Sequence, residues 1–242
     1  MNLLSTTRLI NSAEVSKWKV PQTEDPHKLV EYSLEKFNGL KVIMTTAFGM
    51  EGCALIDMYS RFNASMQVAW IDTGFFFPET LQLIKRMTER YPNVDFVKWE
   101  SKVSPKEQAE EYGQALWQSD PTMCCKIRKV APMLQNMLKY QVWISGIRKS
   151  QTEQRSQTSV LHWNPRYQVA KFSPLAHWTR VDVWNYVQEN DVPFNQLHKQ
   201  GFPSIGCFQC TRAVPNSLPS DDSRAGRWQG TSKTECGLHF SN

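Results

Sequence analysis

The chain has 242 residues, 40% of them hydrophobic and 21% charged, with a formal net charge of +5, which fits one globular domain with a large core. No stretch approaches the roughly 18 consecutive apolar residues of a membrane span, and residues 1–8 lack secretory-signal features, so we expect a cytoplasmic protein without membrane partners. The positive charge favours an anionic partner, but the absence of a dense basic run or zinc-finger spacing argues against nucleic acid.

Strands and helices are expected to alternate along the first half of the chain. After a polar, loosely attached arm over 1–26, the patterns predict a helix over 27–37, strands over 40–46, 66–71 and 94–99, and helices through 55–59, over 78–90 and over 105–112. This alternation predicts an α/β fold with a mainly parallel central sheet flanked by helices. Substrate would then bind beyond the carboxyl ends of the strands.

Two turns at those strand ends are candidates for ligand contact. The small-residue turn at 45–52 would direct backbone N–H groups at a phosphate, although an ordinary strand-helix connection fits its spacing equally well. The aromatic run Phe75-Phe76-Phe77 follows the second turn, at Asp72-Thr73-Gly74. Stacking against a base and simple core packing both fit this run.

The second half continues the pattern to about residue 219. The adjacent pair Cys124-Cys125 opens a helical segment over 126–139, which would put both thiols near a helix N-terminus, where the dipole stabilises thiolates. Strands are predicted over 142–145 and 169–172, and a helix starts at Thr179 with Asp182 at capping-box distance. The core domain is therefore predicted to span 27–219, followed by a flexible, glycine-rich tail over 220–242.

Six cysteines in a reducing compartment indicate metal binding or catalysis rather than disulfides. Cys207 and Cys210 form a Cys-x-x-Cys turn, which fits a redox dithiol, half of a zinc site or half of an iron-sulfur site. Adjacent cysteines suit an iron-sulfur cube better than tetrahedral zinc, because neighbouring side chains are able to reach different irons. Cys124 and Cys125 alone would read as two ordinary thiols.

Positive groups and one further cysteine complete the candidate site. Lys126, Arg128 and Lys129 follow the adjacent pair, either as a solvated face or as charge beside an anionic cluster. Arg148 and Arg155 are suited to bidentate contacts with phosphate or sulfate. In the basic tail, Cys236 reads as a nucleophile or as a spare surface thiol.

Several motifs together resemble the assimilatory adenylyl-sulfate and phosphoadenylyl-sulfate reductases. They are Cys124-Cys125, the run Ile205-Gly206-Cys207-Phe208-Gln209-Cys210-Thr211-Arg212, the tail run Lys233-Thr234-Glu235-Cys236-Gly237-Leu238-His239, the 72–80 turn and Pro174-Leu175 with Trp178. The resemblance implies an adenine nucleotide alpha hydrolase-like fold with a modified pyrophosphatase loop. It also implies a reductase that converts adenosine 5′-phosphosulfate (APS) to sulfite and AMP, in sulfate assimilation and cysteine biosynthesis.

The resemblance also implies roles for individual residues. Cys236 would attack sulfur and carry an S-sulfocysteine intermediate, with thioredoxin or a glutaredoxin-like protein as reductant. Cys124, Cys125, Cys207 and Cys210 would bind a 4Fe-4S cluster. Substrate contacts would come from Thr46, Gly49, Lys129, Arg148, Arg155, Arg224, Arg227 and His239.

Three alternatives stay open. One is reduction of the 3′-phosphorylated substrate (PAPS), alone or together with APS. Another is an ATP pyrophosphatase that modifies RNA, which the Cys236 tail argues against. The third is a non-enzymatic, zinc-stabilised binding module. The sequence does not determine the oligomeric state, and a homo-oligomer stays open.

Overall fold

A six-stranded sheet forms the centre of the protein, with the order β3-β2-β1-β4-β6-β5. The computed structural model describes residues 10–62, 65–219, 224 and 226–239. The strands are β1 (Val42–Thr46), β2 (Met66–Asp72), β3 (Val94–Glu100), β4 (Val142–Ser145), β5 (Leu161–Asn164) and β6 (Val169–Phe172). All neighbouring pairs are parallel except β5 and β6. The mainly parallel sheet is confirmed, whereas the edge strand β5 was not predicted.

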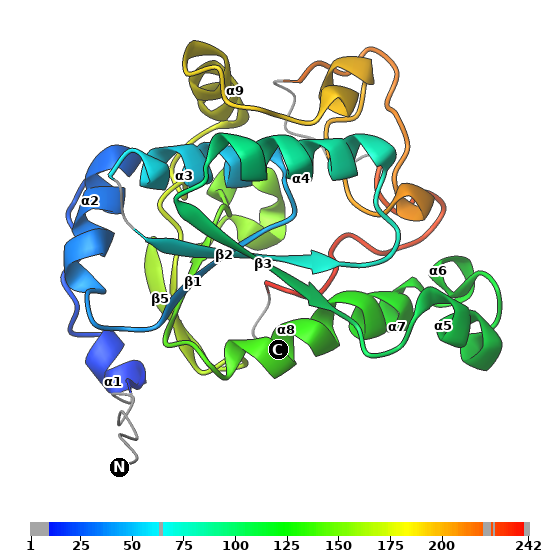
Figure 1. The fold of residues 1–242 in the computed structure, drawn as a ribbon, viewed down its shortest axis with the longest axis horizontal. Coiled ribbons are helices and arrows are strands. Elements are labelled where there is room, and N and C mark those ends of the chain that lie inside the picture. The colour runs from blue at the N-terminus through cyan, green and yellow to red at the C-terminus, as the bar shows by residue number, and fades with distance from the viewer. Residues whose placement is uncertain (1–9, 63–64, 220–223, 225, 240–242) are drawn as a thin grey trace.

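Helices cover both faces of the sheet (Figure 1). The α-helices are α1 (Ser12–Val15), α2 (Pro26–Lys36), α3 (Met50–Ser60), α4 (Pro78–Arg90), α5 (Pro105–Tyr112), α6 (Leu116–Ser119), α7 (Pro121–Cys125), α8 (Ala131–Met137) and α9 (Arg180–Glu189). A π-helical turn, η1 (Lys126–Val130), joins α7 to α8, and short 3-10 turns are η2 (Lys149–Gln151), η3 (Glu153–Arg155), η4 (Gln196–Gln200) and η5 (Phe208–Cys210). Helices α3 and α4 lie on one side of the sheet, and α7 and α8 lie on the other (Figure 1).

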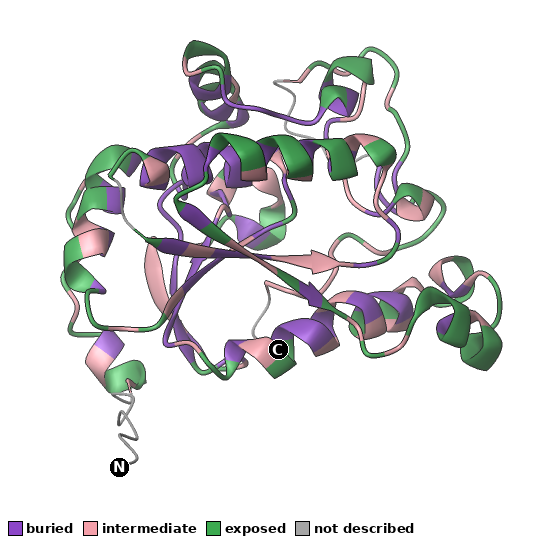
Figure 2. Ribbon diagram, viewed as in Figure 1, coloured by how far each residue is buried: buried purple, intermediate pink, exposed green. Residues whose placement is uncertain are grey.

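The alternation of side chains along the strands divides the core into two parts, one on each face. In β1, Met44 packs into the larger cluster with α2, α3, α4 and α9, while Ile43 packs into the smaller one with α8. The same division separates Val68 from Ala69 in β2. The central strands are largely buried, whereas the edge strand β3 and the outward faces of the helices carry exposed residues (Figure 2). Burial on both faces explains why β4, inside the sheet, is apolar over 142–144.

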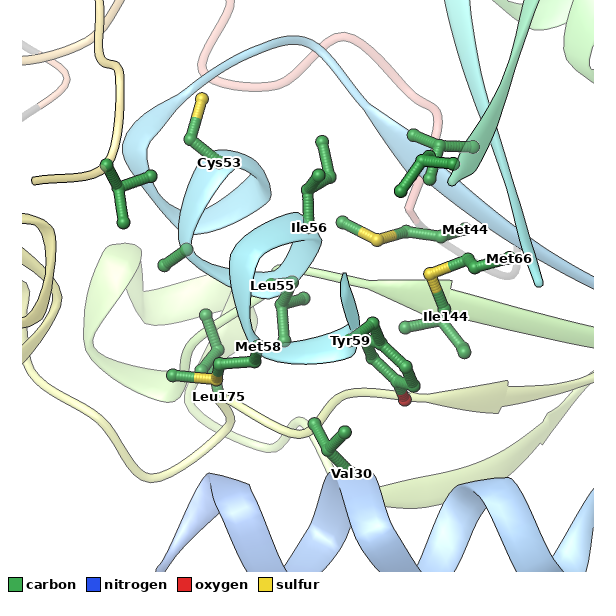
Figure 3. Close-up of a cluster of buried hydrophobic side chains, with 14 of the residues drawn as sticks. Val30, Met44, Cys53, Leu55, Ile56, Met58, Tyr59, Met66, Ile144 and Leu175 are labelled. Carbon is green, nitrogen blue, oxygen red and sulfur yellow. The ribbon is translucent and has the colours of Figure 1, made fainter. Parts of the chain in front are cut away.

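Helix α3 is buried along nearly its whole length. Cys53 through Tyr59 are at most 4% exposed. In Figure 3, Ile56 lies beside Met44 of β1, Met58 lies beside Leu175, and Tyr59 lies above Val30 of α2. The only carboxylate in this stretch, Asp57, accepts hydrogen bonds from Tyr91 Oη (3.0 Å) and Tyr186 Oη (2.6 Å). It also pairs with Arg61 Nε at 2.8 Å. Asp57 therefore ties α3 to the end of α4 and to α9.

The arm before α2 packs more tightly than expected. Val15 of α1 is 4% exposed, and Ile10, Trp18 and Val20 pack against the larger core cluster. Residues 10–25 therefore contact the domain through these four side chains, whereas Ala13 is exposed. Among the helices that the structure describes, none is long and apolar enough to cross a bilayer.

We predict that Asp57→Ala lowers the free energy of unfolding by about 3 kcal/mol, because two buried tyrosine hydroxyls lose their acceptor. Asp57→Asn keeps one carbonyl oxygen and should cost less. Urea unfolding followed by circular dichroism measures both. Asp95→Ala, on the exposed side of the edge strand β3, is the control and should change stability by less than about 0.5 kcal/mol. Equal stabilities for the Asp57 and Asp95 variants would contradict the structural role of Asp57.

Candidate active site

A cavity of about 240 Å³ opens at the carboxyl ends of β1, β2 and β4, as expected for a parallel sheet. Its wall includes residues from each strand end, from the loop before α3, from the Cys207 loop and from the tail. The predicted substrate contacts and the predicted nucleophile all line it: Thr46, Gly49, Lys129, Arg148, Arg155, Arg224, Arg227, Cys236 and His239. The structure thus brings together residues that are up to 193 positions apart, from Thr46 to His239 (239 − 46).

The loop between β1 and α3 presents backbone groups to the cavity. Thr46 Oγ1 accepts a hydrogen bond from Phe48 N at 2.8 Å, and Phe48 has a φ of 54°. Gly49 is the N-cap of α3 and supplies no side-chain cap, and the Glu51 carboxylate accepts a hydrogen bond from its own backbone N–H in the first turn. A Cβ on Gly52 would lie 2.2 Å from Thr46 Oγ1, so only glycine allows this tight turn. Thr46, Gly49, Glu51 and Gly52 of this loop all line the cavity.

Glu51, in the first turn of α3, neutralises two of the cavity arginines. Its Oε1 accepts from Arg148 Nε (3.1 Å) and Nη2 (3.0 Å) and from Arg180 Nη1 (2.9 Å). Burial alone would raise the pKa of Glu51, but Arg180 and Arg148 lower it well below its usual value. Arg148 is only 1% exposed and is held by Glu51. Its predicted substrate contact stays a prediction, and a positioning role fits these bonds better.

Two other arginines hold a carboxylate from the tail. Arg155 donates from Nε to Glu235 Oε1 (2.8 Å) and from Nη2 to Glu235 Oε2 (2.6 Å). Arg224 Nη2 lies 3.6 Å from the same Oε2. Burial, together with the charges of Arg227 and Arg155, lowers the pKa of Arg224 to about 10, although Glu235 opposes the shift. The residue that pairs with these arginines directly precedes Cys236.

Arg227 is fixed against the loop that carries the second cysteine pair. Arg212 N donates to Gly226 O (2.8 Å), and Trp228 N donates to Cys210 O (3.0 Å). A Cβ on Gly206 would lie 2.3 Å from Arg227 Nη2, so the guanidinium occupies the space that any side chain would fill. The predicted tail over 220–242 is described at 224 and 226–239, and that part docks beside the cavity. Its remaining residues lie outside the described part.

The two cysteine pairs lie near one another, and Cys207 also lines the cavity. Cys124 and Cys207 pack in a small apolar cluster with Phe75, and Cys210 packs against that cluster. Phe75 is thus a core residue, while Phe76 lines the cavity. The helix begins at Pro121, one turn before the adjacent pair, because Asp120 caps it by accepting from Thr122 N and Met123 N. The helix therefore starts earlier than predicted, while Cys124 and Cys125 still lie near its N-terminus, as expected.

The thiols and Lys129 influence each other. Burial and the neighbouring Cys125 and Cys207 raise the pKa of Cys124 to about 11. These effects exceed the stabilisation of the thiolate that was expected from the helix dipole. The pKa of Cys207 is lowered instead. Burial raises this pKa, but the charge of Lys129 and a contact with Thr73 Oγ1 at 3.4 Å lower it by more than burial raises it. Partial burial lowers the pKa of Lys129, yet the charges of Cys207 and Cys125 raise it above its usual value.

Within the described ranges, no group of three or more His, Cys, Asp or Glu side chains is placed to hold a metal ion. Cys124, Cys207 and Cys210 share one apolar cluster, and Gln108 Nε2 lies 3.7 Å from Cys124 Sγ. Binding of a 4Fe-4S cluster by the four cysteines stays a prediction.

The tail after Cys236 is held through its backbone. Three consecutive carbonyls accept hydrogen bonds, Gly237 O from Arg166 Nη1 (2.7 Å), Leu238 O from Tyr167 Oη (3.1 Å) and His239 O from Lys171 Nζ (3.4 Å). The His239 ring stacks on Trp143 of β4 with centroids 5.2 Å apart. Burial and the charges of Lys171, Arg155 and Arg224 lower the pKa of His239, so its ring is neutral. Burial and Arg155 lower the pKa of Lys171 to about 7.

Sequence reasoning missed several residues of the site. They are Glu51, Trp143, Arg166, Tyr167, Lys171, Arg180 and Glu235. Two of these residues could have been found, because a charged residue within an apolar stretch indicates a buried charge that needs a partner. Glu51 lies in the apolar helix after β1, and Lys171 lies between Ala170 and Phe172. Arg166 and Tyr167 had no such signal, because they bind backbone carbonyls of the distant tail.

Comparison with known proteins agrees with this architecture. Residues 41–213 match the phosphoadenosine phosphosulfate reductase domain. The chain is 41% identical over 212 residues to a protein named adenosine 5′-phosphosulfate reductase from Lysinibacillus sphaericus, covering 88% of this chain and 89% of that one. It is 38% identical over 223 residues to the protein of the same name from Bacillus anthracis, covering 92% and 97%.

Solved structures give the same result for the fold. A phosphoadenylyl-sulfate (PAPS) reductase from Candida auris, solved as a phosphate complex, superposes with a TM-score of 0.71 at 25% identity, covering 86% of this chain and 100% of that one. FMN adenylyltransferase from Candida glabrata superposes with a TM-score of 0.59 at 14% identity, covering 84% and 72%, and so shares the fold alone.

Fold and cavity together define an α/β protein of the adenine nucleotide alpha hydrolase-like class, as the sequence predicted. Within that class, the chain belongs to the phosphoadenosine phosphosulfate reductase family. It is therefore an oxidoreductase of sulfate reduction.

We predict that Gly206→Ala weakens binding of AMP roughly 10- to 100-fold while leaving thermal stability unchanged, because the new methyl group displaces the Arg227 guanidinium. Isothermal titration calorimetry measures the affinity. Arg227→Gln should show a similar loss, and the double variant should lose little more than Arg227→Gln alone, since both changes act on one group. Additive losses would show that Gly206 acts by another route.

Proposed function

We propose that the protein reduces APS to sulfite and AMP, with a dithiol protein such as thioredoxin as electron donor and Cys236 as nucleophile. The observation that carries this proposal is the position of Cys236, which lines a cavity that also contains Lys129, Arg155, Arg224 and Arg227. A thiol among four cations is suited to attack an anionic electrophile that would repel it in an uncharged site. The names of the relatives that match most of the chain support APS as substrate.

In the first step, the Cys236 thiolate attacks the sulfur of the phosphosulfate. An S–S bond forms, the S–O bond to phosphate breaks, and AMP leaves with the electron pair. Cys236 then carries the sulfonate as S-sulfocysteine. Negative charge grows on the phosphate oxygen as the bond breaks, and cavity cations such as Lys129 and Arg227 would stabilise it. The N–H groups at the start of α3 would bind the phosphate.

In the second step, a thiolate of the reductant attacks the Cys236 sulfur and sulfite leaves with the bonding electrons. The resulting mixed disulfide is resolved by the second thiol of the reductant, which restores Cys236 and leaves the reductant oxidised by two electrons. One sulfur must therefore meet both a buried substrate and a large protein. The tail contacts to Arg166, Tyr167 and Lys171 would hold the first position and break for the second.

Cys124, Cys125, Cys207 and Cys210 would hold a 4Fe-4S cluster. When bound, the cluster would supply fixed negative charge beside Lys129, and the electrons of the reaction would come from the dithiol partner. Lys129, which is already set between the thiols and the cavity, would orient the substrate oxyanion. The π-helical turn that carries Lys129 directly after the adjacent pair supports this role, because such turns occur frequently at functional sites.

PAPS is the second candidate substrate. The Candida auris protein that superposes on this chain is named a PAPS reductase, so the fold accommodates that chemistry. The two substrates differ by one 3′-phosphate, and the ratio of their kcat/KM values distinguishes them. A strong preference for PAPS would overturn the proposal of APS as substrate while leaving the mechanism intact.

We predict that the wild-type protein, purified without oxygen, releases sulfite from APS in the presence of thioredoxin, and that Cys236→Ser lowers this rate by at least about 1,000-fold. Radioactive sulfur from labelled APS should bind covalently to the wild type before reductant is added, but not to Cys236→Ser. Full labelling of the variant would exclude Cys236 as the nucleophile, and absence of sulfite from both APS and PAPS would exclude the reductase activity.

We predict that Cys207→Ala abolishes binding of iron and acid-labile sulfide, because one of four ligands is lost. Cys53→Ala is the matched control, since Cys53 is a buried thiol inside α3 and should leave the iron content unchanged. Metal and sulfide analysis of the anaerobic proteins measures both. Zinc without sulfide in the wild type would instead favour the zinc-stabilised binding module.

A further inference from the structure

Glu235 occupies the arginine pair that faces the cavity. Its carboxylate makes two parallel contacts with Arg155, at 2.8 and 2.6 Å, and a third with Arg224 at 3.6 Å. The Arg155 and Glu235 side chains are 7% and 8% exposed, so the pair is shielded from water. Thr152 Oγ1 adds a contact to Glu235 Oε1 at 3.4 Å. Arg155, Arg224 and Thr152 thus form an anion-binding site, which the tail residue Glu235 occupies.

The geometry of this contact is the one that a guanidinium uses for phosphate and sulfate. Arg148 and Arg180 are paired with Glu51, which belongs to α3 and stays in place. Arg155 and Arg224 instead pair with a carboxylate on the segment that carries the nucleophile. A substrate oxyanion and the Glu235 carboxylate cannot bind Arg155 in the same way at once, because two anions at one guanidinium fork would repel each other.

We propose that Glu235 is a placeholder for substrate: it fills the Arg155–Arg224 anion subsite in the ligand-free enzyme, and an oxyanion of the substrate displaces it. The inference rests on the function proposed above. Arg155 and Arg224 keep an anionic partner in both states, so neither buried cation is left unpaired. Only ligands with an oxyanion are able to make the exchange, and Glu235 therefore acts as a specificity determinant.

The exchange would also move the nucleophile. Glu235 and Cys236 are adjacent, whereas the tail after them is held by separate contacts between its carbonyls and Arg166, Tyr167 and Lys171. Gly237, with a φ of 83°, stands between the two parts. Displacement of Glu235 would shift Cys236 relative to this anchored end without releasing the whole tail. Arrival of substrate is thereby coupled to the position of the attacking sulfur.

The test compares Glu235→Gln with its parent in a Cys236→Ser background, where APS binds but is not consumed. Glutamine keeps the size of the side chain and removes the competing charge. Isothermal titration calorimetry should show APS binding at least about fivefold tighter to the Glu235→Gln protein, the lower end of typical couplings between sites. The affinity for adenosine, which carries no oxyanion, should not change. Glu153→Gln is the matched control, because Glu153 is exposed in the same 3-10 turn as Arg155.

The outcomes separate this inference from the proposed function. If the parent binds APS and Glu235→Gln binds it equally or more weakly, the placeholder is overturned while the reductase proposal stands. If Glu153→Gln tightens binding as much as Glu235→Gln does, the effect is one of general charge and the placeholder is overturned as well. A parent protein that binds no APS at all would overturn the proposed function and, with it, the placeholder.

Discussion

Buried positive charge in one cavity is the constraint on which the rest of the structure depends. Burying an unpaired guanidinium or ammonium is costly, so each cation needs an anionic partner within the fold. Arg148 and Arg180 share Glu51, whose position is fixed by the first turn of α3. Lys129 lies among the thiols, and Arg155 and Arg224 share a carboxylate of the tail. The three arrangements differ in the anionic partner, and only in the last does that partner belong to the segment that the proposed mechanism requires to move.

The fold provides rigid supports for these pairs. Helix α3 is enclosed by the sheet, α2 and α9, and Asp57 locks its far end, so Glu51 at the near end is held without freedom to rotate. The tail is held differently, because its contacts after Cys236 use backbone carbonyls and a stacked ring. Charge pairs fixed by α3 and a tail held through its backbone thus lie side by side in one cavity.

Most helices and strands were predictable because the sequence pattern within each segment determines where the element begins and ends. The helices over 78–90 and 105–112 begin and end as predicted, since each has proline at its first position. Strand β5 was missed because the polar residues His162 and Asn164 interrupt its two apolar residues, so it lacks the apolar run that marks β4. The start of α7 was misplaced although its signal, Asp120 followed by Pro121, is local and of the same kind as the signals that begin α2 and α5.

Cavity residues that belong to a sequence motif were predictable, and every predicted substrate contact lies in the cavity wall. The residues that pair with the cavity arginines were not predictable. Glu51 and Arg148 are 97 positions apart along the chain, and Arg155 and Glu235 are 80 apart. No periodicity within one segment specifies which distant charge a buried arginine meets. That information exists only after the sheet has brought the strand ends together.

The π-helical turn between α7 and α8 accommodates one residue more than a regular helix would. A π turn holds about one more residue than a turn of α-helix does, so deletion of one residue within Lys126–Val130 would let the helix continue as regular α. Because the π turn completes its rotation with that extra residue, the segments before and after the deletion would keep nearly the same relative orientation, and Cys124 and Cys125 would not turn away. The change would instead be local to the turn that carries Lys129, whose side chain lines the cavity. A single deletion there therefore separates the direction of Lys129 from the position of the cysteine pair.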